Sequence, residues 1–439
     1  MTEIRSVIIE LLSHMGSSRE ARQYLKRFSA LDNMQFAVIK VGGGILADHL
    51  DELVDALCFL RHAGLFPITI HGAGTQLNHA LAQAGIDTEI KDGLRVTTPE
   101  VMKVVRPIIY QENLRLVAAL EKRGIKARGL MHGVFRCSEL DRERYGLVGN
   151  VDSVAMNTIS TTLAAQALPI IACLGETDAG QVLNINADSA ARALVEQVQP
   201  YKVIYLTPTG GILDGQGQRI NAINLKTDYQ ALLDADWLHS GMRLKLIEIK
   251  QLLDRLPINA SVSITQACHL TKELFTHRGA GTLIRRGESI LLAEQIMPAH
   301  QSQLKYLLES TFNQRLKDDY FAEPFQLLYA ESWHAAAVIK RGVQGVPYMD
   351  KFVVTPEAQG EGVGAALWHE IRRRFPSLYW RSRNNNPINA WYLQQSDRML
   401  RQHDWLAFSY GISDSILSEA CMESALTRTS SWCEGEVLL

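Results

Sequence analysis

The chain has 439 residues, of which 46% are hydrophobic and 21% charged, and its formal net charge is −2. This balance is that of an ordinary globular protein, and the length is enough for two or three domains. Without an excess of positive charge we expect no nucleic-acid or membrane partner. No apolar run approaches the roughly 18 residues of a membrane span, and the N-terminus lacks a signal-peptide core, so we expect a cytoplasmic protein.

The cysteines and histidines do not have the spacing of a metal site. None of the 13 histidines forms an HxH or HxxxH pair, and no two cysteines form a CxxC pair. We therefore expect no transition-metal site built by the protein, and buried free thiols in place of a disulfide framework. The six cysteines are Cys58, Cys137, Cys173, Cys268, Cys421 and Cys433.

Residues 1–33 have the apolar periodicity of a short helical arm, with little core of its own, that packs on the domain or on another subunit. From Phe36 the pattern changes to strands that alternate with helices. This alternation predicts an α/β architecture with a largely parallel sheet, in which ligands bind at the carboxyl ends of the strands. The expected strands of this domain are residues 36–41, 66–70, 168–172 and 202–206.

Glycine-rich segments follow the first two strands. Lys40-Val-Gly-Gly-Gly44 closes the first, and His71-Gly-Ala-Gly74 closes the second. Glycines at such positions let backbone N–H groups approach phosphate oxygens, and Lys40 adds a mobile positive charge. Glycine-rich turns after strands are common, and no GK[ST] follows, so each segment alone indicates little.

Two more segments of this domain carry polar residues at helix starts. Asn184-Ile-Asn-Ala-Asp188 precedes an expected helix at 189–196, where Asp188 or Ser189 could simply be a helix cap. Ser240-Gly-Met-Arg-Leu-Lys245 places a second lysine in the first turn of another expected helix, where a surface lysine is the ordinary interpretation.

The pattern changes again near Arg285-Arg-Gly-Glu288. A helix is expected at about 299–316 and strands near 325–330, 334–340 and 352–354. This is typical of an α+β domain, so we divide the chain into an arm at 1–33 and two domains at 34–284 and 285–439.

Gln359-Gly-Glu-Gly-Val-Gly364 follows the strand at 352–354 and opens an expected helix at 365–374. Successive N–H groups at a helix N-terminus suit a diphosphate, although a plain glycine-rich turn is the alternative. Nearby, Lys351 could be an exposed strand lysine and Tyr392 a core aromatic residue.

In their order along the chain, the four segments of the first domain resemble the amino-acid kinase family, and within it the N-acetylglutamate kinases, from about Phe36 to Ile284. The resemblance implies a three-layer sandwich with a mainly parallel sheet and ATP with Mg²⁺ as co-substrate. Two departures are Ala73, where the family commonly has a glycine, and Ser240, where GGM is common.

The same resemblance assigns roles to individual residues. Lys40 and Lys245 stabilise the transferring phosphoryl group, and Asp188 holds the two lysines in place. Arg95, in the segment Asp92-Gly-Leu-Arg-Val-Thr97, and Asn184 bind N-acetylglutamate. The N–H donors to the ATP phosphates are Gly43, Gly72 and Gly74. The metal comes with ATP and has no ligand from the protein.

The second domain, from roughly Glu288 to Phe408, resembles the GNAT acetyltransferases, in particular the N-acetylglutamate synthase domain that follows an amino-acid kinase domain. The resemblance is carried by Tyr348-Met-Asp-Lys-Phe-Val-Val354, the glycine turn, and the segment Trp380–Tyr392. It implies that Lys351 and Arg381 bind the carboxylates of glutamate, that Asn386 orients it, and that Tyr392 serves the leaving thiolate. The implied acetyl-CoA residues are Val353, Val354, Gln359, Gly360, Gly362 and Gly364.

The segment Phe275–Ile284, with Gly279 and Gly281, resembles the end of the arginine-feedback site in arginine-sensitive members of the kinase family, which also carry an extra N-terminal helix. L-Arginine is therefore an expected effector, besides the ligands L-glutamate and N-acetyl-L-glutamate, and a homo-oligomer, a tetramer or a hexamer, is expected.

Three hypotheses follow: a bifunctional synthase and kinase, a synthase with a regulatory kinase domain, or a kinase with a non-catalytic rear domain. An inactive kinase should have lost Lys40, Asp188 or Lys245, and an inactive acetyltransferase the glycine turn or Tyr392. All are present, which favours the first hypothesis.

Overall fold

The computed structural model describes residues 35–238, 240–257, 260–275, 280–293, 295–356, 358–359 and 362–437. The chain divides into two compact units between Arg286 and Gly287, here called the front unit and the rear unit. The helical arm expected at residues 1–33 lies outside the described residues, as do Gly279 and Gly360.

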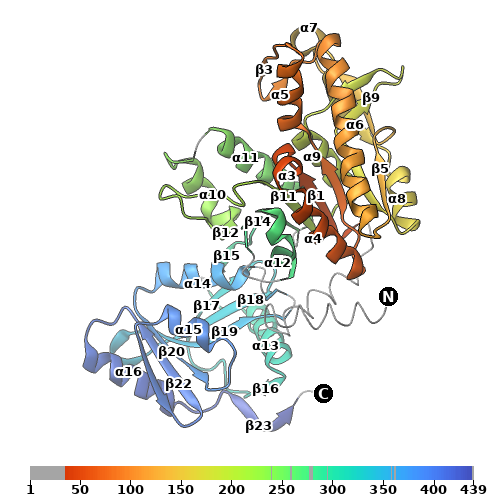
Figure 1. The fold of residues 1–439 in the computed structure, drawn as a ribbon. Helices are drawn as coiled ribbons and strands as arrows, with labels where there is room; N and C mark the ends of the chain where they lie inside the picture. Colours follow the sequence, from red (N-terminus) through yellow and green to blue (C-terminus); the bar gives the residue numbers. More distant parts are fainter. Residues whose placement is uncertain are drawn as a thin grey trace. The chain divides into compact units, whose positions relative to one another are not determined.

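The apolar runs of the front unit form the predicted sheet (Figure 1). Its eight strands follow the order β12–β14–β13–β11–β1–β2–β8–β5, and every neighbouring pair is parallel except β13 and β14. In that order the strands are Ala222–Asn224, Thr282–Arg285, Ser261–Thr265, Lys202–Leu206, Ala37–Val41, Ile68–His71, Leu168–Ala172 and Ala127–Leu130.

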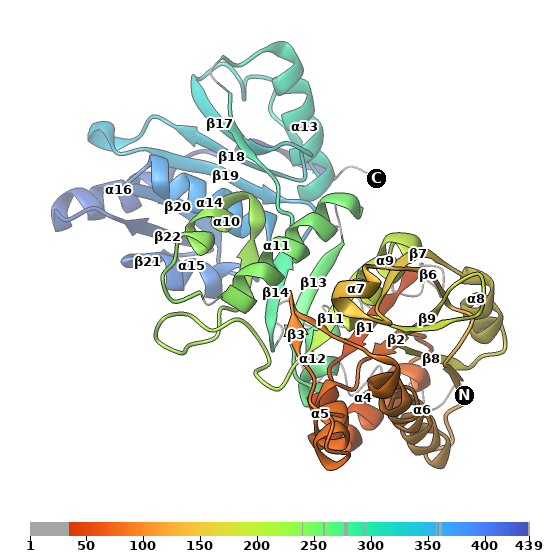
Figure 2. The same ribbon diagram turned by 90° about the horizontal axis from the view of Figure 1, so that it is seen from above.

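Helices cover both faces of this sheet, with α4, α6 and α12 on one face and α8, α9 and α11 on the other (Figure 2). Because both faces are covered, β8 and β11 are buried at every position, which explains their continuous apolar sequences. The predicted three-layer sandwich is confirmed. The helices are α4 Leu50–His62, α6 Pro99–Lys122, α12 Leu270–Phe275, α8 Met156–Ala164, α9 Ala187–Val198 and α11 Ser240–Arg255.

Smaller elements complete the front unit. A second sheet has the order β10–β9–β6–β7, and β3 and β4 form a hairpin. These strands are Val182–Asn184, Leu174–Glu176, Phe135–Glu139, Gly149–Val154, Ile90–Lys91 and Leu94–Arg95. The other α-helices among the described residues of this unit are α3 Gly43–Asp48, α5 Gly74–Gln83, α7 Arg142–Tyr145 and α10 Leu225–Leu233.

The rear unit contains a seven-stranded sheet in the order β15–β17–β18–β19–β20–β22–β21. Neighbouring strands in this sheet are antiparallel, except that β19 and β20 are parallel. In that order the strands are Ile290–Leu292, Phe325–Ala330, Ala335–Lys340, Tyr348–Val354, Leu378–Arg383, Trp405–Tyr410 and Arg398–Gln402. The mixed sheet and its helices confirm the predicted α+β domain.

Alternate side chains of the rear sheet serve two separate cores. Ala335, Ala337 and Ile339 of β18 face a core with α14 and α15, whereas Ala336 and Val338 face α13. Helix α16 covers the second face over β20 and β22. These helices are α14 Val363–Arg374, α15 Asn389–Gln395, α13 Pro298–Phe312 and α16 Ser415–Thr427.

The helix predicted to reach residue 316 ends earlier, at Phe312. Asn313 has a φ of 52°, and asparagine tolerates this left-handed conformation, which ends a helix. The following residues Gln314–Leu316 form β16, which pairs with the C-terminal strand β23, Trp432–Val437.

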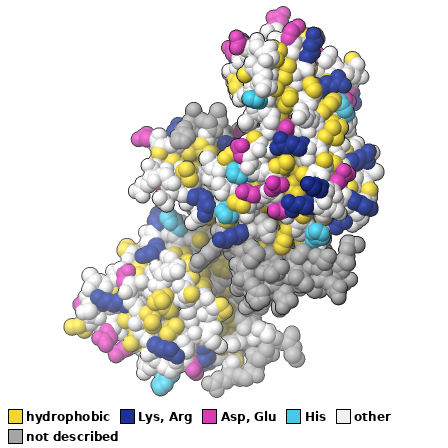
Figure 3. Space-filling model, viewed as in Figure 1, with side chains coloured by type: hydrophobic (Ala, Val, Ile, Leu, Met, Phe, Trp, Pro, Cys, Tyr) yellow, Lys and Arg dark blue, Asp and Glu magenta, His cyan; other side chains and the backbone are white. Residues whose placement is uncertain are grey.

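Two surface features bear on the sequence expectations. Cys268 is exposed, so the expectation of buried thiols is wrong there, while Cys58, Cys137, Cys173 and Cys421 are buried. Basic and acidic side chains are interspersed on the face shown in Figure 3, in keeping with the near-neutral net charge. No helix among the described residues has the length and apolar character needed to cross a membrane.

Candidate active sites

The two glycine segments of the front unit lie against each other. Strands β1 and β2 are parallel neighbours with Val41 opposite His71, so both loops leave the same edge of the sheet. A Cβ on Gly43 would lie 2.8 Å from the Gly74 nitrogen and 3.0 Å from the Thr75 nitrogen, so only glycine fits there. Gly72 is tight against Ala187 of α9, with 3.1 Å between a Cβ and the Ala187 Cβ, whereas Gly74 has open space.

Gln76 of α5 fixes the orientation of the first loop, and sequence reasoning missed it. Its Nε2 donates to the Gly43 carbonyl at 3.0 Å and to Glu112 Oε2 at 3.3 Å. Because C=O and N–H point in opposite directions across a planar peptide, this bond turns the N–H of Gly44 away from Gln76. A glutamine inside an amphipathic helix gives no sequence signal for such a role.

Three charged residues meet beside these loops. Lys40 Nζ pairs with Asp188 Oδ1 at 2.8 Å. Both Lys40 and Lys245 lie near the ring of Tyr205, at 6.0 and 5.9 Å from its centroid. Tyr205 of β11 is directly opposite Lys40 of β1 in the sheet, so both lysines lie near one ring. The structure thus brings the three predicted residues together.

The structure excludes one alternative and corrects one local expectation about these residues. Asn186 is the N-cap of α9, since its Oδ1 accepts from the N–H groups of Asp188 and Ser189. The Asp188 side chain therefore does not cap the helix and instead pairs with Lys40. Lys245 lies in the second turn of α11, which begins at Ser240, and not in its first turn.

The electrostatics of this cluster favour charged groups. Burial raises the pKa of Asp188, but the positive charges of Lys40 and Lys245 outweigh it and bring the pKa below its usual value. Burial lowers the pKa of Lys245, and the charge of Asp188 opposes this. Two ammonium groups around one carboxylate leave an excess of positive charge beside the glycine loops, which suits an anionic group.

The two residues predicted to bind N-acetylglutamate are joined through Thr97. The Asn184 amide donates to Thr97 Oγ1 at 3.1 Å, and that hydroxyl donates to the carbonyl of Arg95 at 2.8 Å. The guanidinium of Arg95 donates to Thr88 Oγ1 at 2.6 Å and to Asn78 Oδ1. Burial lowers the pKa of Arg95. Asn78 and Thr88 hold this side chain, and neither was predicted.

In the rear unit the central strands β19 and β20 separate. They pair only at Tyr348 with Tyr379 and at Met349 with Trp380, and their later residues are unpaired with each other. The glycine turn follows β19 and leads into α14. Gly362 caps α14 with a φ of 85°, which favours glycine, and a Cβ on Gly364 would lie 3.1 Å from Val354 Cγ2.

The other predicted acetyl-CoA residues lie around this turn. Gln359 Nε2 donates to the Val354 carbonyl at 3.3 Å and so closes the turn onto the strand. Val353 is buried in the core beneath α13, whereas Val354 packs on the core beneath α14. Only the backbone of Val353 can therefore serve a ligand on the α14 side.

Tyr392 of α15 lies on the same side as α14, inside an aromatic cluster. Its nearest ring is that of Trp380, with 5.4 Å between centroids, and burial raises the pKa of its phenol above the usual range. Among the described residues the hydroxyl has no hydrogen-bond partner. The other rings around it are Phe352, Trp368, Trp391 and Phe408.

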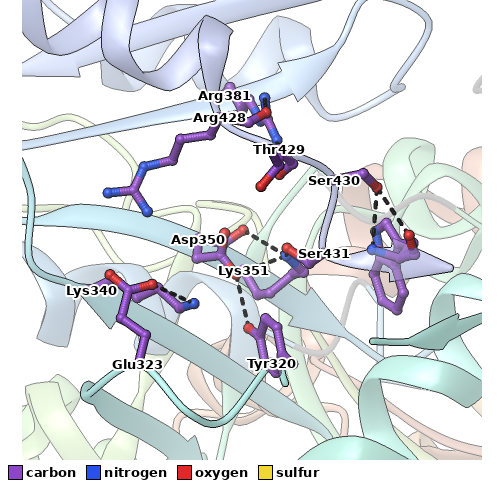
Figure 4. A network of polar contacts seen from close by, with 11 residues as sticks. Tyr320, Glu323, Lys340, Asp350, Lys351, Arg381, Arg428, Thr429, Ser430 and Ser431 are labelled. Atoms are coloured by element: carbon purple, nitrogen blue, oxygen red, sulfur yellow. Dashed lines mark hydrogen bonds and ion pairs between the residues drawn. The ribbon is translucent and has the colours of Figure 1, made fainter. Parts of the chain in front are cut away.

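Lys351 reaches the opposite face of the sheet because β19 carries a bulge. Val338 pairs with Lys351 and Ile339 with Met349, so Asp350 is the extra residue. The side chains of Asp350 and Lys351 consequently meet on the α13 side, with Lys351 Nζ 2.8 Å from Asp350 Oδ2 and both side chains less than a tenth exposed (Figure 4). Tyr320 donates to the same carboxylate oxygen at 2.9 Å.

Burial opposes both charges of this pair. It lowers the pKa of Lys351, and the charge of Asp350 and its hydrogen bond oppose this. Burial raises the pKa of Asp350, but Lys351 and, more weakly, Lys340 bring it below its usual value. The two groups therefore stabilise each other as ions.

Arg381 of β20 also lies on this face, where its guanidinium is 4.2 Å from the ring centroid of Trp405. Its Nη1 donates to the Arg428 carbonyl at 2.6 Å and its Nη2 to the Thr429 carbonyl at 3.1 Å. Asn386, in contrast, uses its Oδ1 to accept from the Ile388 N–H at 3.3 Å in the turn before α15. The structure thus places Lys351 and Arg381 on one face and Tyr392 on the other, at strands that separate.

Gly281 is packed at the start of β14. A Cβ there would lie 2.2 Å from the Ile264 carbonyl oxygen, so a larger residue is excluded. The N–H groups of Ala280 and Gly281 donate to Oε2 of the buried Glu273 at 2.7 and 2.9 Å. Glu273 was not predicted, because it lies in α12, before the glycine-rich segment whose N–H groups donate to it.

Two family models match the chain. The amino acid kinase family matches residues 35–262, and the N-acetyltransferase of N-acetylglutamate synthase matches residues 291–428. A protein of Xylella fastidiosa named acetylglutamate kinase is 48% identical over 399 residues, which cover 91% of this chain and 95% of that protein. One of Xanthomonas campestris pv. campestris with the same name is 45% identical, covering 94% and 99%. Both matches are longer than the front unit and include the rear unit.

A solved structure shares the fold of both units. It is the N-acetylglutamate synthase of Neisseria gonorrhoeae complexed with coenzyme A and N-acetylglutamate, with a TM-score of 0.63 and 19% identity, covering 89% of this chain and 98% of that one. The same synthase complexed with coenzyme A and L-arginine has a TM-score of 0.59 and 18% identity, covering 90% and 98%.

Proposed function

Since the chain belongs to the amino acid kinase family and carries an N-acetyltransferase domain of the N-acetylglutamate synthase type, we propose that it is a bifunctional enzyme of arginine biosynthesis. The rear unit acetylates L-glutamate with acetyl-CoA to N-acetyl-L-glutamate. The front unit phosphorylates N-acetyl-L-glutamate with ATP to the acyl phosphate. Support comes from relatives named acetylglutamate kinase that match across both units.

The single observation that carries the kinase proposal is the cluster of Lys40, Asp188 and Lys245 beside the glycine loops. The side-chain carboxylate of N-acetylglutamate is already an anionic nucleophile, so the reaction needs no general base. It needs positioning and neutralisation of charge on the γ-phosphoryl group, which two lysines and oriented N–H groups supply. Arg95 and Asn184 are proposed to hold the substrate.

We propose that Mg²⁺ enters this site bound to ATP. No group of three or more His, Cys, Asp or Glu side chains that could hold a metal is found among the described residues, and Asp188 is already paired with Lys40. When bound with the nucleotide, Mg²⁺ would supply positive charge against the phosphates, beside Lys40 and Lys245. The residues of the front unit then bind the nucleotide and the acceptor.

For acetyl transfer, we propose that the coenzyme diphosphate lies at the N-terminus of α14 and that its thioester enters where β19 and β20 separate. The glutamate amine attacks the thioester carbonyl, the C–S bond breaks, and the amine proton passes to solvent. Tyr392 donates a hydrogen bond to the leaving thiolate, which takes its proton from solvent. Lys351 and Arg381 bind the acceptor carboxylates from the other face of the sheet.

The experiment that tests the bifunctional proposal is an assay of both half-reactions with the purified full-length chain. We expect coenzyme A release that depends on L-glutamate, and acyl phosphate formation that depends on ATP and N-acetyl-L-glutamate. Acetyl transfer without acyl phosphate formation would instead support a synthase whose front unit is an arginine-binding regulatory module. Acyl phosphate formation alone would leave the rear unit as a non-catalytic module.

A second prediction concerns L-arginine, which we propose binds the front unit near Gly281 and changes the activity of the rear unit. The synthase from N. gonorrhoeae, which shares this fold, has been crystallised with L-arginine. A coupling of this kind is typically about 1–3 kcal/mol, or about 5- to 150-fold in affinity, and is reciprocal for binding. We expect heat of binding in calorimetry and a changed rate of acetyl transfer at millimolar L-arginine. If calorimetry detects no heat of binding and L-arginine leaves the rate of acetyl transfer unchanged, the proposal is contradicted.

A further inference from the structure

The C-terminal segment Arg428–Trp432 returns from α16 to the face of the rear sheet that carries Lys351 and Arg381 (Figure 4). Its path is fixed from two sides. Trp432 is opposite Leu316 in the pairing of β16 with β23, and its ring is 5.3 Å from that of Phe312, centroid to centroid. The match to the N-acetyltransferase family ends at Arg428, so the family model assigns no role to Thr429–Trp432.

Lys351 has no donor left for a ligand in this arrangement. An ammonium group has three N–H donors. Lys351 directs one to Asp350 Oδ2 at 2.8 Å, one to Ser431 Oγ at 2.9 Å, and has the Asp350 carbonyl at 3.4 Å. A ligand carboxylate can therefore reach the ammonium only by displacing one of these partners.

Of the two described side chains that accept from Lys351 Nζ, Asp350 at 2.8 Å and Ser431 at 2.9 Å, Ser431 is the one that a carboxylate can displace. Asp350 is charged and is held in addition by Tyr320 and by the bulge in β19. Ser431 offers a neutral hydroxyl, and an ammonium group binds a carboxylate more strongly than a hydroxyl because the opposite charge adds Coulomb attraction. Exchange of the Ser431 hydroxyl for a ligand carboxylate is thus favourable for Lys351.

At Arg381, too, the segment occupies positions that a ligand carboxylate could take. Two carbonyl oxygens of consecutive residues, Arg428 and Thr429, accept from its Nη1 and Nη2. Two oxygens on one edge of a guanidinium are the arrangement that a carboxylate adopts there. The segment therefore provides stand-ins for carboxylate oxygens at both residues.

We propose that the segment Arg428–Trp432 is a displaceable internal occupant of the acceptor site, and that Ser431 sets how tightly the rear unit binds an acidic acceptor. Ser431 is a positioning residue that acts through Lys351. The inference rests on the proposed acetylation of L-glutamate. Binding of the acceptor exchanges the hydroxyl and the two carbonyls for carboxylate oxygens, without any covalent step in the segment.

The test compares two aspartate variants of neighbouring serines. Ser431→Asp places a carboxylate on Lys351 that the acceptor must displace. Ser430→Asp adds the same charge one residue earlier, where, within the described part of the chain, the exposed hydroxyl hydrogen-bonds to the backbone of Trp432. In the full-length chain at saturating acetyl-CoA, we expect Ser431→Asp to raise the KM for L-glutamate at least about tenfold with a smaller change in kcat. Ser430→Asp should change the KM less than about twofold.

We expect Ser431→Ala to change the KM for L-glutamate in the opposite direction from Ser431→Asp. Removal of the competing hydroxyl frees one donor of Lys351, so the KM for L-glutamate should fall by about three- to tenfold, the size of one ordinary hydrogen bond. An unchanged or higher KM would overturn the inference, as would equal effects of Ser431→Asp and Ser430→Asp. If Ser431→Asp fails to fold, Ser431→Ala decides alone.

Failure of the inference is distinguishable from failure of the proposed function. A wild-type chain that does not acetylate L-glutamate overturns both. A wild-type chain that acetylates it, with KM values that do not respond to Ser431 as described, overturns this inference alone.

Discussion

Replacement of Lys245 by methionine is expected to lower the turnover of acyl phosphate formation by about 10²–10³-fold, the size of other positioned electrostatic donors. Lys245 and Lys40 both lie near the ring of Tyr205, and Asp188 is paired with Lys40. The charge of Lys245 is needed most as negative charge develops on the transferring phosphoryl group. Methionine keeps an unbranched side chain but removes that charge, so kcat should fall far more than the affinity for N-acetyl-L-glutamate changes.

Two controls separate this effect from a folding defect. Acetyl transfer by the same variant should stay near wild type because the rear unit carries that reaction. Lys226→Met, at an exposed lysine of α10, removes an equal charge from the front unit and should leave kinase turnover unchanged. Near-wild-type acyl phosphate formation by Lys245→Met would show that the kinase site is assigned wrongly.

Replacement of Tyr392 by phenylalanine should lower the turnover of acetyl transfer by roughly 10²-fold, within the range for acid–base groups. Burial raises the pKa of this phenol above its usual range, so it stays protonated at neutral pH and can donate to the thiolate. Phenylalanine keeps the ring and its contacts with Trp380 and the other aromatic residues. The KM for acetyl-CoA should barely move, and kinase turnover should be unaffected.

Tyr410→Phe is the matched control for Tyr392→Phe. Tyr410 lies in the same aromatic core, but its hydroxyl donates to the Phe375 carbonyl at 2.9 Å. Loss of that hydroxyl should cost about 1 kcal/mol of stability and leave acetyl-transfer turnover near wild type. If Tyr392→Phe behaves in the same way, Tyr392 is only a packing residue and water serves the leaving thiolate.

Much of the fold was predictable because its signals are local. Continuous apolar runs predicted β8 and β11 within one residue, since strands covered on both faces need apolar side chains at every position. The glycine segments after β1 and β2 were also visible in the sequence. Glycine is required there because contact between the two loops leaves no room for a side chain at Gly43. Boundaries that depend on a single backbone conformation, such as the end of α13 at Phe312, were not predictable.

The candidate sites were only partly predictable, because several of their residues act through partners that are distant in sequence. Gln76, Asn78 and Glu273 hold loops or side chains by hydrogen bonds, and none stands in a recognisable motif. A glutamine, an asparagine or a glutamate in a helix is most often a solvated residue. Their roles depend on which loop or side chain the fold places beside them.

The sequence alone determined the alternation of strands with helices in the front unit, the two glycine-rich turns of that unit and the one of the rear unit, and the identity of the charged residues. Tertiary structure decided which of these residues meet. Lys245 and Lys40 lie near the same ring because parallel pairing of β1 with β11 sets Tyr205 opposite Lys40. Lys351 faces α13 because one extra residue, Asp350, shifts the alternation of β19, and Ser431 reaches Lys351 because β23 pairs with β16. Side-chain direction in a strand reverses with every residue, so a bulge or a distant pairing, which local sequence does not encode, decides the face on which a charge acts.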